Sequence, residues 1–164
     1  MLPRLLADKH ARSGRGRKVV AVNLQPSDQN IEPTESPEPG SDDFDGWFGR
    51  GLKFAQLGFP DRAVESFERA EVIRPDDATI QFNMGTAHLT LGNFVQAVAN
   101  LDRAIKLDPT NSDAYGNRAV AHAGLGEEEL SKRDVATAVS LGAPEEGIEV
   151  VLDYVRGRVN PEQD

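Results

Sequence analysis

Residues 44–77 read FDGWFGRGLKFAQLGFPDRAVESFERAEVIRPDD, and the layout of this stretch returns twice more at a step of 34 residues. The step joins small residues and Leu-Gly pairs in register: Gly51, Gly85 and Ala119; Leu57-Gly58, Leu91-Gly92 and Leu125-Gly126; Ala63, Ala97 and Ser131; Ala70, Ala104 and Ala138. A fixed period of this length, with small and large apolar residues at constant offsets, is the sequence signature of a helix-turn-helix solenoid.

Each unit is predicted to contain two antiparallel helices. Two apolar faces at helical spacing follow one another in the first unit: Trp47, Gly51 and Phe54, then Ala63, Phe67 and Ala70. Between these faces, Gly58 suits the left-handed residue that ends a helix, and Pro60 suits the first turn of the next one. Pro75 then ends the second helix. Residues 44–157 are therefore expected to be all-α.

The segment from Phe44 to about Leu141 resembles three tetratricopeptide repeats. The family pattern has an aromatic residue, Leu-Gly and Tyr in the first helix, then Ala, Phe, Ala and a closing Pro. The three units match it at Trp47, Gly51, Phe54, Ala63, Phe67, Ala70 and Pro75; at Gly85, Ala97, Ala104 and Pro109; and at Tyr115, Ala119, Val135 and Ala138. They depart from it at Arg50, Gln81, His88, Arg118, Ser131 and Ala143. The resemblance implies an α-solenoid, a scaffold that serves many functions.

The repeats divide the chain into a tail, three units and an ending. The predicted ranges are a disordered N-terminal tail and linker (1–43), repeat one (44–77), repeat two (78–111), repeat three (112–143), a capping helix (144–158) and a C-terminal tail (159–164). A repeat array needs a cap because its last unit otherwise exposes an apolar face. The capping helix is expected to cover the second helix of repeat three around Val135 and Val139; a truncated fourth repeat is the alternative.

The first 43 residues have a different composition from the repeats. Residues 1–18 hold six basic residues and one acidic residue, whereas residues 25–45 hold seven acidic residues, no basic residue and four prolines. Such a segment buries too little apolar surface to fold alone, so it is predicted to be disordered. A cytoplasmic location is expected. Import into an organelle is the alternative, because Leu2, Leu5 and Leu6 stand among arginines in an acid-poor start.

Neither an enzyme nor a cofactor-binding protein is expected. There is no cysteine, the net charge is −9, and no hydrolase, phosphate-loop or dinucleotide motif occurs. His88 and His122 occupy the column of Phe54, so each is expected to fill a slot between helices rather than bind a metal. Glu127, Glu128 and Glu129 suit a helix N-terminus. No apolar run is long enough to span a membrane, and nucleic-acid binding is not expected of so acidic a chain.

The family resemblance implies a concave groove lined by the first helix of each unit. Its predicted residues are Phe48, Leu52, Gln56, Phe82, Asn83, Thr86, Asn117 and Val120, together with Asp45, Thr90, Asp113 and Gly116. Phe48 and Phe82 are expected to form an apolar wall that interhelical packing does not need. Asn83 and Asn117 are expected to form an amide floor that fixes the backbone of a bound peptide.

One function within the family can be tested by residue identity. Members that hold the C-terminal Glu-Glu-Val-Asp of chaperones use basic residues and asparagines, and the matching columns here hold Phe48, Leu52, Asn83, Asp113 and Asn117. Without cations, a terminal carboxylate has no charged partner, so a carboxylate clamp is rejected. The sequence predicts a non-enzymatic protein-protein interaction module that binds a peptide or helix of a partner. The alternative is a self-associating scaffold or assembly factor, and hence a homo-oligomer.

Overall fold

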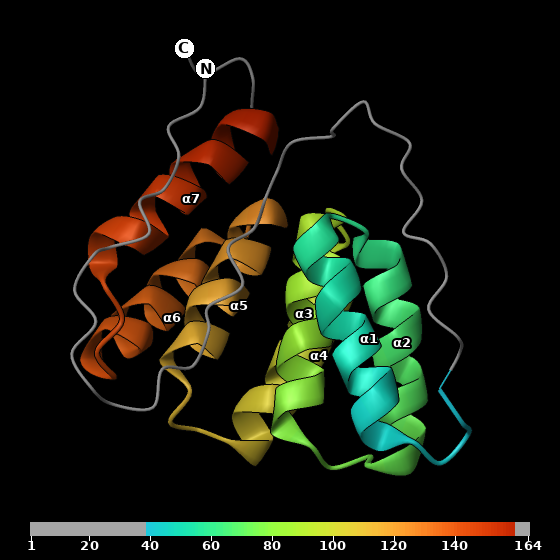
Figure 1. Ribbon diagram of the computed structural model, residues 1–164. Helices are drawn as coiled ribbons and strands as arrows, with labels where there is room; N and C mark the ends of the chain where they lie inside the picture. The colour runs from blue at the N-terminus through green and yellow to red at the C-terminus, as the bar shows by residue number, and fades with distance from the viewer. Residues whose placement is uncertain (1–38, 160–164) are drawn as a thin grey trace, which may run out of the picture.

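The computed structural model describes residues 39–159, and these form seven helices with no strand among them. The helices are α1 (Phe44–Leu57), α2 (Pro60–Ile73), α3 (Ala78–Thr90), α4 (Phe94–Leu107), α5 (Ser112–Gly124), α6 (Glu128–Ser140) and α7 (Glu145–Val159). The first six stack as three antiparallel pairs, and α7 follows them (Figure 1). The predicted all-α solenoid of three helix pairs and a C-terminal helix is confirmed. The tail predicted for residues 1–43 lies outside the described residues up to position 38, and so do residues 160–164.

Local sequence signals set the ends of these helices. Asp77 accepts hydrogen bonds from the backbone N–H groups of Thr79 and Ile80 at 2.8 and 3.3 Å, which satisfies donors that the first turn of α3 leaves unpaired. At the other end of a helix, Gly58 ends α1 in the left-handed conformation, with φ at 83°. Pro60 then opens α2, where a missing N–H costs nothing. The turn signals that the sequence repeats thus act as predicted.

The two helices of a pair meet at small residues. Ala63, Ala97 and Ser131, one per unit, have no exposed surface. The facing position in the second pair is Gly85, where an added Cβ would stand 2.6 Å from Cγ of Leu101. Such a distance is too short for a real contact, so a residue larger than glycine would force the helices apart. Close approach is therefore built into the repeating column of small residues.

The core consists of two apolar clusters that meet at α3. One cluster fills the first pair and the near side of α3: Phe54, Ala63, Val64, Phe67, Ala70, Ile80, Met84 and Ala87. The other fills the remaining helices: Leu89, Ala97, Leu101, Ala104, Ala114, Ala119, Val120, Ala121, Ala123, Val135 and Leu152. Each unit therefore contacts its neighbours and not the whole molecule, as in other solenoids.

Polar side chains replace apolar ones at two departures from the repeat pattern. Arg118 of α5 donates to both carboxylate oxygens of Asp134 on α6, at 2.6 and 2.7 Å, and to Asp102 on α4 at 2.6 Å. The bonds to Asp134 are the main reason that the pKa of Arg118 lies above its usual value, although burial opposes them. In the second unit, buried Gln81 donates to Glu71 of α2 at 2.8 Å and accepts from Asn100 of α4 at 3.0 Å. Both residues tie three helices together.

His88 lies in the column of Phe54, and its half-buried ring is consistent with the slot predicted for it. Its Nδ1 is buried and has no hydrogen-bond partner in the described part of the chain. Burial lowers the pKa of His88 from the ordinary value of 6.5, with a smaller opposing effect from Glu68. The neutral ring is therefore the form that the fold accommodates.

Replacing Ala97 with Leu is expected to lower the free energy of unfolding by about 1–3 kcal/mol, because the added atoms must enter the contact between α3 and α4. Urea unfolding measures the effect. Ala99→Leu is the matched control, since Ala99 lies exposed on the same helix, and it should change stability by less than about 0.5 kcal/mol. Equal stability of the two variants would contradict the close contact.

The free energy of unfolding is also expected to fall in mild acid, because His88 resists protonation in the folded state. Because its folded pKa lies below the unfolded value, the unfolded chain binds the proton more tightly, and stability is lost as pH falls below 6.5 toward the folded pKa. His88→Phe removes the imidazole that takes up this proton. The difference in unfolding free energy between pH 8 and pH 5, measured in urea, should therefore be smaller in the variant. An equal difference in both proteins would show that His88 is readily protonated in the folded state.

Candidate functional site

The last helix lies beside α5 and not across the outer side of α6. It packs chiefly on α5, with only a minor contact to α6, and the two helices run side by side in Figure 1. Leu152 is fully buried, and an added Cβ on Gly116 would lie 3.6 Å from Cδ1 of Ile148. The prediction that this helix chiefly covers α6 around Val135 and Val139 is therefore corrected. The apolar face of α7 follows the first helix of repeat three because glycine leaves room there.

A pair of charged residues holds the other edge of α7 to α6. Arg156 donates to the two carboxylate oxygens of Glu128 at 2.9 and 3.2 Å. These bonds lower the pKa of Glu128 and raise that of Arg156. Both side chains are partly exposed, so the pair contributes modestly to stability and mainly fixes the orientation of α7.

A cavity of about 520 Å³ lies between the end of α3, the length of α5 and α7. Its lining residues are Leu89, Thr90, Gly92, Phe94, Ser112, Asp113, Gly116, Asn117, Val120, Ala143, Pro144, Gly147, Ile148, Val151, Tyr154 and Val155. Most of the side chains are apolar. A volume of this size falls in the range of about 300–1,000 Å³ that is typical of small-ligand sites in proteins. The cavity is the candidate functional site.

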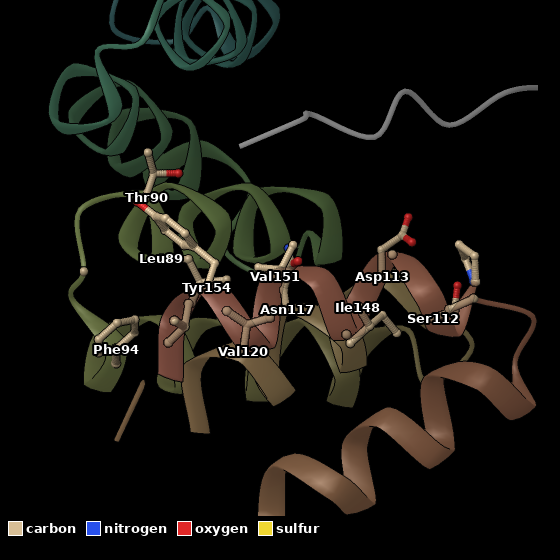
Figure 2. A pocket seen from close by; sticks show the side chains of 16 residues that line it. Leu89, Thr90, Phe94, Ser112, Asp113, Asn117, Val120, Ile148, Val151 and Tyr154 are labelled. Atoms are coloured by element: carbon tan, nitrogen blue, oxygen red, sulfur yellow. The ribbon is translucent and has the colours of Figure 1, made fainter. Parts of the chain in front are cut away.

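The two ends of the cavity differ in chemistry. Figure 2 shows Ser112 and Asp113 at one end, and Thr90, Phe94 and Tyr154 at the other. Asp113 is the one charged residue in the lining, and it stands in the first turn of α5. A ligand in this cavity would therefore meet a carboxylate at one end, aliphatic side chains in the middle and two aromatic rings at the other end.

Part of the predicted groove lies in this cavity. Asn117 and Val120 line it, and so do Thr90, Asp113 and Gly116 of the same predicted groove. Thr86 lies behind Asn117, whose Nδ2 donates to the Thr86 hydroxyl at 2.9 Å. Four of the predicted groove residues, Asp113, Gly116, Asn117 and Val120, thus lie on the α5 wall of one cavity.

The other predicted groove residues lie outside the cavity. Phe48 and Leu52 pack on the first core cluster, Phe82 packs on the second, and Gln56 is exposed. The expectation that interhelical packing does not need Phe48 is wrong. Its ring lies 5.7 Å from that of fully buried Phe67 on α2, centroid to centroid, and stacks on Phe44 at the same distance. Asp45 is exposed in the first turn of α1.

The predicted amide floor is largely engaged within the protein. Asn83 is buried, and its Nδ2 donates to the carbonyl oxygen of Thr79 at 2.7 Å. Thr86 donates to the carbonyl oxygen of Phe82 at 2.9 Å and accepts the bond from Asn117. Only Asn117 combines an amide with a place in the cavity lining.

The α7 wall of the cavity is the part that sequence reasoning missed. Ile148, Val151, Tyr154 and Val155 contribute to it. Their spacing predicted an amphipathic helix, but spacing does not say which neighbour receives the apolar face. The available signal was Gly116, a glycine in the middle of a predicted helix, because such a glycine often marks a close approach by another element.

His122, in the same repeat column as His88, has partners that the sequence did not suggest. Nδ1 of buried His122 lies 2.6 Å from Oε2 of Glu127, and Nε2 lies 3.8 Å from Oδ2 of Asp134. Asp134 is already held by Arg118. Among the described residues, no group of three or more histidine, cysteine or acidic side chains is arranged to hold a metal ion. The charged cluster thus supports the packing of α5 on α6.

Comparison with known proteins gives one family match. Residues 90–126 match the model of a family described as TPR repeat. No curated protein sequence matches the chain. Within residues 39–159, no helix has the length and apolar character that crossing a membrane requires.

Several solved structures share the fold. The second TPR domain of Spaghetti (RPAP3), bound to the HSP90 peptide SRMEEVD, is 27% identical with a TM-score of 0.59, over 62% of this chain and 94% of that one. The second TPR domain of human RPAP3, in complex with the HSP70 peptide SGPTIEEVD, is 25% identical with a TM-score of 0.62, over 71% and 98%. The Arabidopsis OM64 TPR domain is 23% identical with a TM-score of 0.64, over 71% and 98%, and shows the fold alone.

Removing the buried anchor of α7 is expected to destabilise the site. Leu152→Ala should lower the free energy of unfolding by about 2–5 kcal/mol, because it leaves a cavity under α7. Val150→Ala is the control on the same helix, since Val150 is half exposed. Hydrogen exchange should show faster exchange along α7 in the first variant. Unchanged exchange there would mean that α7 does not depend on its contact with α5.

Proposed function

Because the described part of this chain is a domain of tetratricopeptide repeats, we propose that it is a non-enzymatic module that binds a peptide or helix of another protein. The observation that carries this proposal is the apolar cavity between α3, α5 and α7. Domains of this fold are protein-protein interaction modules, and two of the similar structures hold peptides. The cavity supplies what such binding needs, a concave apolar surface with a few polar groups that fix orientation.

The chemistry of the cavity suggests how a segment would be held. The aliphatic middle, formed by Val120, Ile148 and Val151, gains free energy when a ligand displaces water from it. Asn117 uses one amide hydrogen on Thr86. Its second hydrogen and its carbonyl oxygen suit the backbone of a bound segment. Affinity would thus come from apolar burial, and register from one amide.

We also propose that the domain does not hold a chaperone C-terminus in the manner of a carboxylate clamp. Phe48 and Leu52 are apolar and pack on the core. Asp113 places a negative charge in the cavity lining, and Asn83 is buried with its amide bonded to its own helix. A peptide that ends in acidic residues would be repelled by Asp113 and would find no cation among the residues that line the cavity.

Self-association into an assembly scaffold is the second candidate function. Val72 of α2 is 83% exposed and Val95 of α4 is 66% exposed. Exposed aliphatic side chains on the outer helices would be covered if copies of the domain packed together. Light scattering of the double variant Val72→Ser with Val95→Ser tests this case. If the domain self-associates through these side chains, the molar mass of the variant should fall below that of the wild type.

The binding site can be tested by filling the cavity. Gly116→Leu places an aliphatic side chain in the cavity, where a Cβ meets Ile148 at ordinary contact distance, and it replaces a residue that disfavours helices. Peptides selected from a random library by the wild type should bind the variant at least tenfold more weakly in fluorescence anisotropy. Gly157→Leu is the matched control, because a Cβ there meets nothing within 4 Å.

Two outcomes would count against the proposal. If Gly116→Leu binds the selected peptides as tightly as the Gly157→Leu control does, the cavity is not the binding site. A labelled SRMEEVD peptide should show no saturable binding to the wild type. Saturable binding that weakens in Asn83→Ala with Asn117→Ala would establish the clamp that we reject.

A further inference from the structure

The cavity is suited to a ligand that is both apolar and positively charged. Asp113 carries the one charge in its lining. Glu145 and Glu146 do not line the cavity, but both are exposed in the first turn of α7, next in sequence to the lining residues Pro144 and Gly147, and add negative charge to that end of the helix. Opposite charge on a ligand would select it and orient it in the cavity.

The chain itself contains a segment of this chemistry. Leu2, Leu5 and Leu6 recur at the spacing of one helical face, and Arg4, Lys9 and Arg12 lie among and after them. Asp8 is the only acidic residue in the first twelve. These residues lie outside the described part of the structure. Their three leucines match the aliphatic middle of the cavity, and their basic side chains match its acidic end.

We propose that residues 1–12 occupy the cavity of their own chain as an internal ligand. The inference rests on the proposed function, because it uses the same cavity. The segment would dock as an amphipathic turn with its leucines against Val120, Ile148 and Val151, which is the helix-in-groove mode of recognition. Its cations would face Asp113 and the two glutamates of α7. An external partner would then have to displace the segment before binding.

The length of the connecting chain supports docking within one molecule. Residues 13–38 lead from the segment to the first described residues before α1. A random coil of this length has a root-mean-square span of about 28 Å, prolines and like charges such as those of residues 25–38 lengthen it, and full extension exceeds about 80 Å. The cavity lies on α5 and α7, two to three helix spacings of about 10 Å from α1. Span and distance therefore agree, which gives an effective local concentration on the order of millimolar.

The absence of cysteine from the chain allows a direct test on all 164 residues. Ala7→Cys carries a nitroxide spin label, and NMR measures signal loss at the methyl groups of Val120, Ile148 and Val151. We expect strong, localised loss at these methyl groups. Ser41→Cys is the control label, since Ser41 is exposed next to α1, and it should leave these signals in place.

Variants and a mixed sample make the outcomes decisive. Leu5→Ser with Leu6→Ser should abolish the loss, and Asp113→Asn should reduce it at least twofold. Mixing spin-labelled, NMR-silent chain with unlabelled, NMR-visible chain should give no loss. Loss of the methyl signals in the mixed sample would show docking between molecules and overturn the proposal. The proposal would also be overturned if the first sample showed no loss, or if the serine variant showed the same loss. If selected peptides still bind the cavity in those cases, this proposal fails alone; if Gly116→Leu leaves peptide binding unchanged as well, the proposed function fails with it.

Discussion

The structure depends on close approach of the two helices within each pair. At this contact a small residue on one helix faces a large side chain on the other, as Gly85 on α3 faces Leu101 of α4. Because the backbone is so near, the large residues on either side can interlock across the pair. Phe67 and Leu101 are fully buried for this reason. Stacked pairs then bury two apolar clusters that meet at α3, and the first helices of the pairs line one side of the stack.

The docking of α7 against α5 encloses part of that side as a cavity. Its apolar face covers part of α5, but glycine at position 116 and the gap toward the end of α3 leave space between the three helices. The acidic and aromatic ends of this space follow from the parallel course of α5 and α7. Asp113 stands in the first turn of α5, and later turns of the two helices contribute Val120 and Tyr154 to the lining. The site is thus a product of the final helix as much as of the repeats.

The sequence predicts the fold well because its signals are local and repeated. Helix ends at Gly58 and Pro60 follow from backbone chemistry that a single residue decides. The site is predicted less completely. Asn117 and Val120 can be placed on the cavity wall by repeat column, but the partners of Asn83 and Phe48 depend on side-chain packing between helices. The position of α7 could not be derived either, because an apolar face with the right spacing fits against any apolar neighbour.

The division of the apolar core into two clusters has a mechanical consequence. Ile80 and Met84 of α3 belong to the first cluster, whereas Leu89, at the end of the same helix, belongs to the second. Helix α3 therefore contributes to both apolar clusters, and each cluster buries its own set of side chains. A solenoid of this kind can lose order at one end while the other end stays packed. The α7 end could loosen, and the cavity widen, without any cost to the aromatic cluster around Phe67.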